Sequence, residues 1–274
     1  MSKLTRSTGY VRCDGEDIYF ERTGEGPPVV LCHGLGGNHA IWWRQIEPLA
    51  ARHDVITWDQ RGFGNSTARS GEIGPPGARR DLHAILDHLG LESVSLVGQS
   101  MGGWAALGYA QANPGRIRSL ILSTTLAGAD RKHVDILVGA EADRNRMNRR
   151  EHPVLSPAFC SAHPDLGVLY NQISSFGARP DPASVLRSMA EDRLDLLPLE
   201  RMPVPTLALM AADDHLCPPV AMEGLVSRLT HGALQVIPGS HSAYYERPES
   251  WNEAVLDFLA SQPTQSEKAG RYAP

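Results

Sequence analysis

The stretch that decides the fold is Val94-Ser95-Leu96-Val97-Gly98-Gln99-Ser100-Met101-Gly102-Gly103-Trp104. It begins with a short apolar run, which predicts a buried strand, and it continues through the pattern G-x-S-x-G into residues with helical spacing. Such a turn is sharp and needs small neighbours, which Gly98 and Gly102 provide. It predicts that the Ser100 hydroxyl lies at the amino end of a helix, where a nucleophile would be well placed. A glycine-rich turn without function is the alternative.

Length and charge limit the class of protein. A chain of 274 residues can form one large α/β domain or two small ones. The net charge is a mild -5, and the one long basic run, Arg144–Arg150, is expected to be a solvated helix face. Residues 1–10 have no apolar segment, and no stretch approaches about 18 consecutive apolar residues. We therefore expect a cytoplasmic protein that binds neither nucleic acid nor membrane.

The four cysteines are scattered along the chain. They form no C-x-x-C pair and have no histidine at the spacing of a metal site, so they are expected to be reduced thiols that pack as small apolar side chains. The sequence thus predicts no metal and no cofactor. The cysteines are Cys13, Cys32, Cys160 and Cys217.

Strands and helices are expected to alternate over the first half of the chain and again near its end. This alternation predicts an α/β fold with a mostly parallel eight-stranded sheet, helices on both faces, and ligands at the carboxyl ends of the strands. The expected strands lie at 9–12, 17–22, 29–32, 54–58, 94–97, 117–122, 205–210 and 234–237, and the expected helices include 41–51, 78–89, 219–229 and 248–259.

The alternation is interrupted after the sixth predicted strand. Residues 125–203 have helical and irregular polar segments without a convincing buried strand, which predicts a helical lid over the strand ends. The core is then formed by residues 1–124 and 204–262. Residues 263–274 are polar and are expected to be a flexible tail.

A serine nucleophile needs a base that accepts its proton, and histidine suits this task near neutral pH. Of the eleven histidines, His241 is favoured because it follows the last predicted strand, at the edge where Ser100 is expected. A carboxylate must hold the other ring nitrogen, and Asp213 and Asp214 both follow the strand at 205–210. The chemistry leaves open which aspartate acts.

The chain resembles the α/β-hydrolase fold superfamily over residues 10–260. The acid of that superfamily usually stands three residues after a strand-ending glycine and four before a proline. Ala211 and Pro218 occupy these positions here, and the alignment therefore selects Asp214. The motifs that carry the resemblance are His33-Gly34-Leu35-Gly36, Asp59-Gln60-Arg61-Gly62-Phe63-Gly64-Asn65-Ser66, Gly98-Gln99-Ser100-Met101-Gly102-Gly103, and His241 followed by Glu246 and Pro248.

The resemblance also implies roles for the loops around the serine. It implies an oxyanion hole formed by the backbone N–H groups of Leu35 and Met101. His33, Asp59 and Arg61 are then expected to fix their loops rather than to react. Candidates for lining the acyl pocket are Trp42, Trp43, Trp104 and Tyr244, with core packing as the alternative for each.

A serine at this turn implies an acyl intermediate, so we expect hydrolysis of a small ester or lactone. The first alternative is a hydrolase that cleaves a carbon–carbon bond in a ring-fission diketone. Those enzymes usually have Gly-Pro-Gly in the first loop and a tryptophan after the histidine, whereas this chain has Leu35-Gly36-Gly37 and Ser242. A ligand-binding or receptor protein of the same fold is the second alternative. A homo-oligomer is compatible with the sequence, which does not identify the substrate.

Overall fold

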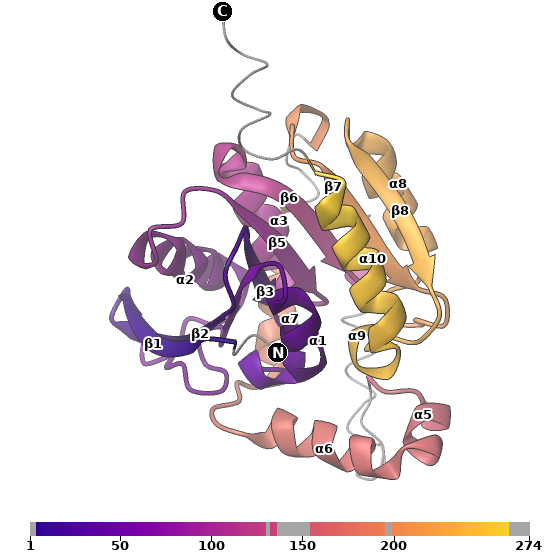
Figure 1. The fold of residues 1–274 in the computed structure, drawn as a ribbon, viewed down its shortest axis with the longest axis horizontal. Coiled ribbons are helices and arrows are strands. Elements are labelled where there is room, and N and C mark those ends of the chain that lie inside the picture. Colours follow the sequence, from indigo (N-terminus) through magenta and orange to yellow (C-terminus); the bar gives the residue numbers. More distant parts are fainter. Residues whose placement is uncertain (1–3, 130–131, 136–153, 195–198, 263–274) are drawn as a thin grey trace, which may run out of the picture.

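An eight-stranded sheet forms the centre of the molecule (Figure 1). The computed structural model describes residues 4–129, 132–135, 154–194 and 199–262. The strands are β1 (Arg6–Cys13), β2 (Glu16–Thr23), β3 (Pro28–Cys32), β4 (Asp54–Trp58), β5 (Val94–Gln99), β6 (Ile117–Ser123), β7 (Thr206–Ala211) and β8 (Gly232–Ile237).

The strand order is β1-β2-β4-β3-β5-β6-β7-β8. The β1–β2 and β2–β4 pairs are antiparallel, and all other pairs in the sheet are parallel. The predicted mostly parallel eight-stranded α/β sheet is therefore confirmed. Every residue of β5 is buried, as expected of a strand covered on both faces.

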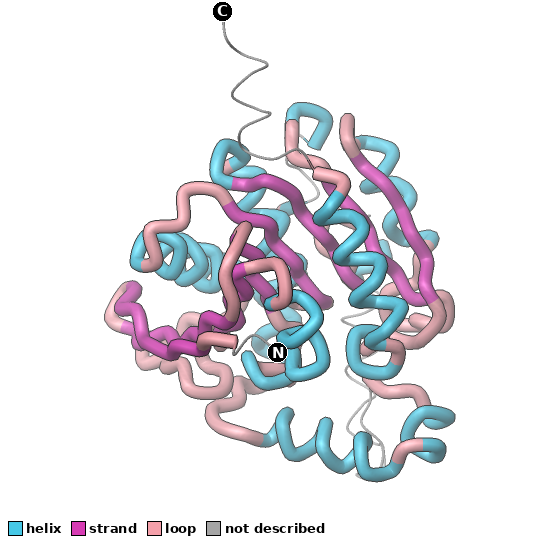
Figure 2. The backbone as a smooth tube through the Cα atoms, viewed as in Figure 1, coloured by secondary structure: helices cyan, strands magenta, loops and turns pink. Residues whose placement is uncertain are grey.

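Helices cover both faces of the sheet (Figure 2). Alternate residues of the central strands β3 to β7 belong to two separate apolar clusters, so that Leu96 of β5 packs on one face and Val97 on the other. The described helices are η1 (His39–Trp42), α1 (Trp43–Ala50), α2 (Pro75–His88), α3 (Gly102–Ala112), η2 (Pro114–Arg116), α5 (Pro157–Ala162), α6 (Pro164–Ser175), α7 (Pro182–Glu191), η5 (Leu199–Arg201), α8 (Val220–Arg228), α9 (Ala243–Glu246) and α10 (Pro248–Ala260). Residues of α2, α3, α7 and α8 join the first cluster, and residues of α5, α6, α9 and α10 join the second.

Several elements differ at their ends from the sequence prediction, and two of these lie near the start of the chain. The helix expected at 41–51 is divided into η1 and α1, and η1 begins earlier than expected because the Asn38 side chain accepts a hydrogen bond from the N–H of Ala40 and caps a tight turn there. The first hairpin is longer than expected. Its strand β1 lies at the exposed edge of the sheet, where burial does not mark the strand ends.

The segment between β6 and β7 contains the helices α5, α6 and α7. Figure 1 shows α5 and α6 beyond the carboxyl ends of the strands. Phe159 of α5 and Tyr170 of α6 pack into one core cluster, and Met189 of α7 packs into the other. The division into a core and a lid stays a prediction. Residues 130–131, 136–153 and 195–198 of the expected lid, the basic run within it and the expected tail lie outside the described residues.

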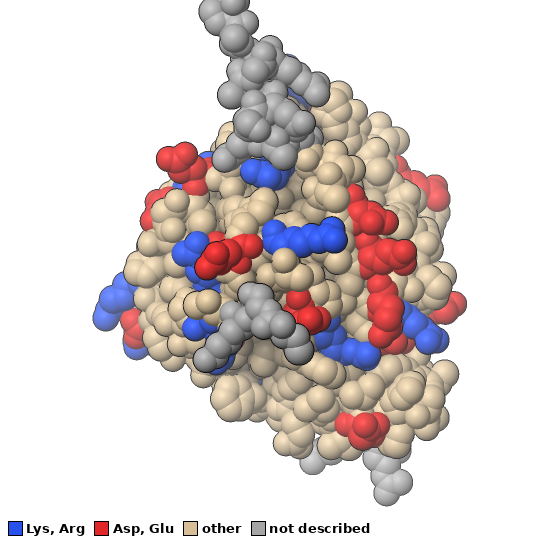
Figure 3. Space-filling model, viewed as in Figure 1, with Lys and Arg blue, Asp and Glu red and all other residues tan. Residues whose placement is uncertain are grey.

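The face covered by α1 and α10 carries both acidic and basic residues (Figure 3). Along α10 the exposed acidic residues are Glu249, Glu253 and Asp257, whereas Trp251 and Val255 of the same helix are buried against the sheet. This distribution is typical of an amphipathic surface helix. Within the described parts of the chain, no helix has both the length and the apolar character needed to cross a bilayer.

We predict that Glu16 stabilises the first hairpin in a pH-dependent way. Its carboxylate accepts hydrogen bonds from the Thr67 hydroxyl at 2.6 Å and from the N–H groups of Arg69 and Ser70 at 2.8 Å each. Burial alone would raise its pKa, but these donors outweigh burial and lower the pKa from 4.5 to about 2. The unfolded chain therefore binds the proton first as pH falls. The contribution is complete at pH 7 and is lost between pH 4.5 and about 2.

Glu16→Gln should lower the free energy of unfolding at pH 7 by about 1–3 kcal/mol, because it removes a buried charged acceptor from three hydrogen-bond donors. Urea denaturation at pH 7 and at mildly acidic pH would measure this, and the variant should lose less stability on acidification than the parent. The exposed Glu25, changed to glutamine, is the control and should unfold like the parent. Equal stability of parent and Glu16→Gln at pH 7 would contradict the prediction.

Candidate active site

The turn between β5 and α3 presents Ser100 as the sequence predicts. Ser100 has a φ of 49°, in the left-handed region that side chains rarely adopt. Glycines are required beside it. A Cβ atom at Gly98 would lie 2.6 Å from the Gly102 carbonyl oxygen, and one at Gly102 would lie 2.1 Å from the Cys32 carbonyl oxygen. The close approach of α3 to the end of β5 thus explains Gly98, and its close approach to the end of β3 explains Gly102.

The structure brings Ser100, His241 and Asp214 together. The Oγ atom of Ser100 lies 2.9 Å from Nε2 of His241, and Nδ1 of His241 lies 2.9 Å from Oδ2 of Asp214. The carboxylate is buried and the serine is half-buried. In this chain of contacts Nδ1–H donates to the carboxylate and Nε2 is left to accept the serine proton.

The two adjacent aspartates have different environments. Oδ1 of Asp214 accepts hydrogen bonds from the N–H groups of Leu216 and Cys217, at 2.9 Å each. These two donors close the turn after β7 and leave Oδ2 facing the imidazole. The Asp213 side chain is exposed, while its N–H donates to the Gly239 carbonyl. The geometry therefore agrees with the selection of Asp214.

Gln99 and Thr125 support this arrangement and were not singled out from the sequence. The Nε2 group of Gln99 donates to the carbonyl of His241 at 3.2 Å, which ties the histidine loop to the serine turn. The Thr125 hydroxyl donates to the Ser100 carbonyl at 2.6 Å. The position of Gln99 inside G-x-S-x-G could have indicated that it belongs to the site. No motif near Thr125 in the sequence indicates its contact with Ser100.

The loop after β3 lies directly against the serine. A Cβ atom at Gly34 would clash with Oε1 of Gln99 and would lie 3.1 Å from the Cβ of Ser100, so glycine at this position lets the loop lie against the serine turn. The Gly34 carbonyl accepts hydrogen bonds from Nδ1 of His33 at 2.8 Å and from the N–H of Gly37 at 3.0 Å. In a trans peptide the next N–H points the opposite way, so these bonds fix the direction of the Leu35 N–H.

His33 anchors the loop as a neutral imidazole. The N–H of Gln60 donates to its Nε2 at 3.0 Å, so the ring proton is on Nδ1. Burial lowers the pKa of His33 and outweighs the hydrogen bond to Gly34, which acts in the opposite direction. The second amide expected in the oxyanion hole, that of Met101, lies at the amino end of α3, where the helix dipole favours an anion. The role of both amides stays a prediction.

Asp59 and Arg61 have loop-fixing contacts, as the resemblance implies. Asp59 is buried and accepts from the N–H of His39 at 2.6 Å and from the N–H of Asn65 at 2.7 Å. Arg61 donates two hydrogen bonds to the buried Asp81, at 2.6 Å and 2.7 Å. The observed contacts of both residues therefore bind loop and helix segments to one another.

The aromatic candidates for the acyl pocket lie in different places. Trp42 is buried, with ring centroids 4.9 Å from Tyr244 and 5.8 Å from Trp251. The Tyr244 hydroxyl lies 3.1 Å from that of Tyr170 in α6. Trp42 thus packs between α9 and α10, whereas Tyr244 also reaches α6, and contact of either ring with a substrate stays a prediction. Trp43 is 44% exposed on α1.

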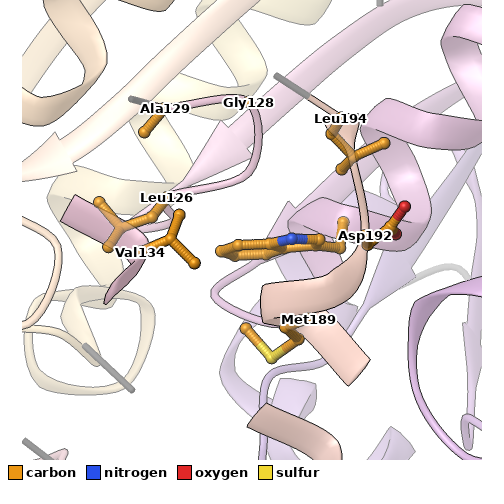
Figure 4. A pocket seen from close by; sticks show the side chains of 8 residues that line it. Leu126, Gly128, Ala129, Val134, Met189, Asp192 and Leu194 are labelled. Carbon is orange, nitrogen blue, oxygen red and sulfur yellow. The ribbon is translucent and has the colours of Figure 1, made fainter. Parts of the chain in front are cut away.

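Trp104 lines a small pocket beside α3. The labelled residues around this pocket come from the β6–α5 connection and from the end of α7 and the chain just after it (Figure 4). The pocket is small, and Asp192 is the charged residue among those that line it. Because Trp104 follows Ser100 by one helical turn, this pocket adjoins the serine end of α3. Its lining is completed by Leu126, Gly128, Ala129, Val134, Met189 and Leu194.

Comparison with known proteins identifies the class. A family model described as "alpha/beta hydrolase fold" matches residues 27–153. A protein of Azorhizobium caulinodans, provisionally named carbamate hydrolase RutD, is 30% identical over an alignment that covers 91% of this chain and 97% of the relative. The chain belongs to the alpha/beta hydrolase fold family, and the resemblance inferred from its motifs is confirmed.

Two further proteins indicate the range of activities around this chain. The 3-oxoadipate enol-lactonase 2 of Acinetobacter baylyi is 26% identical, with 84% of this chain and 87% of the relative covered. The structure of a thermophilic esterase from Thermogutta terrifontis has a TM-score of 0.77 and 29% identity, with 93% and 98% of the two chains covered. The chain is thus similar to several hydrolases that differ in substrate.

Proposed function

We propose that the protein is a serine hydrolase that cleaves a small ester or lactone through an acyl-enzyme. The observation that carries this proposal is the unbroken contact from Ser100 Oγ through His241 to Asp214, with 2.9 Å at each step. The similarity to an enol-lactonase and to an esterase supports the choice of an acyl group bound to oxygen.

In the first half of the reaction, Oγ of Ser100 attacks the acyl carbon while its proton passes to Nε2 of His241. Asp214 holds Nδ1–H and stabilises the imidazolium. The carbonyl oxygen becomes an oxyanion, to which the N–H groups of Leu35 and Met101 donate. The intermediate collapses when the carbon–oxygen bond to the leaving alcohol breaks and His241 returns the proton to that oxygen.

In the second half, water attacks the acyl-enzyme and His241 again takes and returns the proton. With a lactone the leaving oxygen stays attached to the acyl group, so the product is one hydroxy acid. An ester instead yields an acid and a separate alcohol. The same residues serve both substrates, and the pocket around the acyl chain decides between them.

A substrate panel with active-site labelling tests this proposal. The panel contains p-nitrophenyl acetate, simple lactones and a ring-fission diketone at neutral pH, and a fluorophosphonate probe labels the nucleophile. We expect turnover of esters or lactones and a labelled peptide that contains Ser100. Turnover of the diketone alone would instead support the carbon–carbon bond hydrolase. Labelling at another serine would overturn the mechanism.

A further inference from the structure

A third potential metal ligand lies beside the histidine–aspartate pair. One ligand atom each from Asp214, Cys217 and His241 can be chosen so that all three lie within 4.8 Å of one another, and all three residues are buried. The imidazole comes from a different loop than the carboxylate and the thiol, so the spacing along the chain did not predict this group. A carboxylate, a thiol and an imidazole together are a donor set that zinc and cadmium favour.

We propose that Asp214, Cys217 and His241 form an inhibitory site for Zn²⁺ or Cd²⁺. Ligands of a tetrahedral zinc ion lie about 3.3–3.6 Å apart, as bond lengths of about 2.0–2.3 Å require. Shifts of about 1 Å or less per side chain would bring the three ligand atoms to that spacing. The turn that carries two of them is already closed by the N–H groups that donate to Asp214 Oδ1.

The charges of the site suit a divalent cation. Binding replaces the thiol proton, which leaves to solvent, and gives one thiolate and one carboxylate opposite the ion. A buried pair of negative charges is costly alone, and the ion neutralises it. Mg²⁺ prefers oxygen ligands and water, so it should not compete for this site.

A metal ion bound to Nδ1 of His241 would prevent the histidine from acting as the catalytic base, although the ion would not contact Ser100. The imidazole proton moves from Nδ1 to Nε2, because Nδ1 now gives its lone pair to the metal. The Nε2–H group then donates toward Ser100 Oγ, 2.9 Å away, and cannot accept the serine proton. Inhibition should therefore not be overcome by raising the substrate concentration. This consequence for activity rests on the proposed function, whereas the binding site itself does not.

Metal binding can be measured separately from catalysis in the full-length Ser100→Ala protein, which lacks the proposed nucleophile. We expect one equivalent of Cd²⁺ to produce the ultraviolet charge-transfer absorbance of a cadmium–thiolate bond, and Mg²⁺ to produce none. In the Ser100→Ala protein, the second substitution Cys217→Ser should abolish the absorbance and weaken Cd²⁺ binding by about 10-fold or more. Even the loss of a residue that only orients a metal ligand lowers metal affinity by about 10–100-fold. Cys13→Ser is the matched control, a half-buried thiol on β1 that should leave binding unchanged.

Activity provides the second measurement. Cd²⁺ should inhibit the parent and the Cys13→Ser variant at the same concentration, while Cys217→Ser should need at least about 10-fold more. Unchanged absorbance in the Cys217→Ser background, or no Cd²⁺ binding to the Ser100→Ala protein, would overturn the inhibitory site. A parent that binds Cd²⁺ as expected but turns over no ester or lactone would contradict the proposed function and leave the metal site supported.

Discussion

Ser100→Ala is expected to reduce kcat for p-nitrophenyl acetate by a factor on the order of 10⁶, the loss typical of removing a nucleophile that acts as one unit with its base. Without Oγ no acyl-enzyme can form, and His241 has no proton to accept. The remaining rate would come from the oxyanion hole and substrate binding alone. Stopped-flow or steady-state absorbance of the released nitrophenolate measures the effect.

The control for this substitution is Ser95→Ala in the same strand. Ser95 is buried, and its hydroxyl accepts a hydrogen bond from Ser119 at 2.9 Å. Ser95→Ala therefore measures how the loss of a hydroxyl within β5 affects activity when the turn at Ser100 is unchanged. It should keep the parent's kcat within a few-fold. Ester hydrolysis that survives in Ser100→Ala would rule out the acyl-enzyme. A parent without turnover that still bound a ligand would favour the binding-protein alternative.

The buried strands could be predicted because parallel strands covered on both faces are continuous apolar runs. The structure has β4 at Asp54–Trp58, the range that the sequence predicts. Edge strands are harder to delimit. The last strand was expected from residue 234 but begins at Gly232, because glycine and alanine at its start give only a weak apolar signal and half of the residues in the strand are exposed.

The serine and histidine were identified from motif and position, since both follow strands that end at one edge of the sheet. The choice between Asp213 and Asp214 needed family alignment. In the structure it depends on which carboxylate the N–H groups of the turn point toward, and side-chain chemistry alone does not encode that. Asp213 and Asp214 are adjacent in the chain, yet the first side chain is exposed and the second is buried.

The features of the site that the sequence did not predict are contacts between segments that are far apart in the chain. The approach of Gln99 to the His241 carbonyl and the meeting of the Tyr170 and Tyr244 hydroxyls join residues that are 142 and 74 positions apart. Such pairs leave no periodicity in the sequence. The same is true of Cys217, whose thiol was predicted to be a small apolar side chain and which lies beside two potential metal ligands.

Asp214→Asn is expected to lower kcat by about 10⁴-fold with little change in KM, because an amide can hold the imidazole in the wrong tautomer and cannot stabilise the imidazolium. The fold should survive, since the amide oxygen can still accept from the N–H groups of Leu216 and Cys217. Steady-state kinetics on the best ester or lactone would give both constants, and thermal unfolding would check stability.

Asp213→Asn is the matched control, because it makes the same chemical change one residue away on an exposed side chain. It should retain kcat within about 3-fold of the parent, as a surface substitution away from the reacting groups does. If the large loss of kcat instead followed Asp213→Asn, with Asp214→Asn nearly as active as the parent, the orienting acid would be the exposed residue. The buried 2.9 Å contact to His241 Nδ1 would then have no catalytic role.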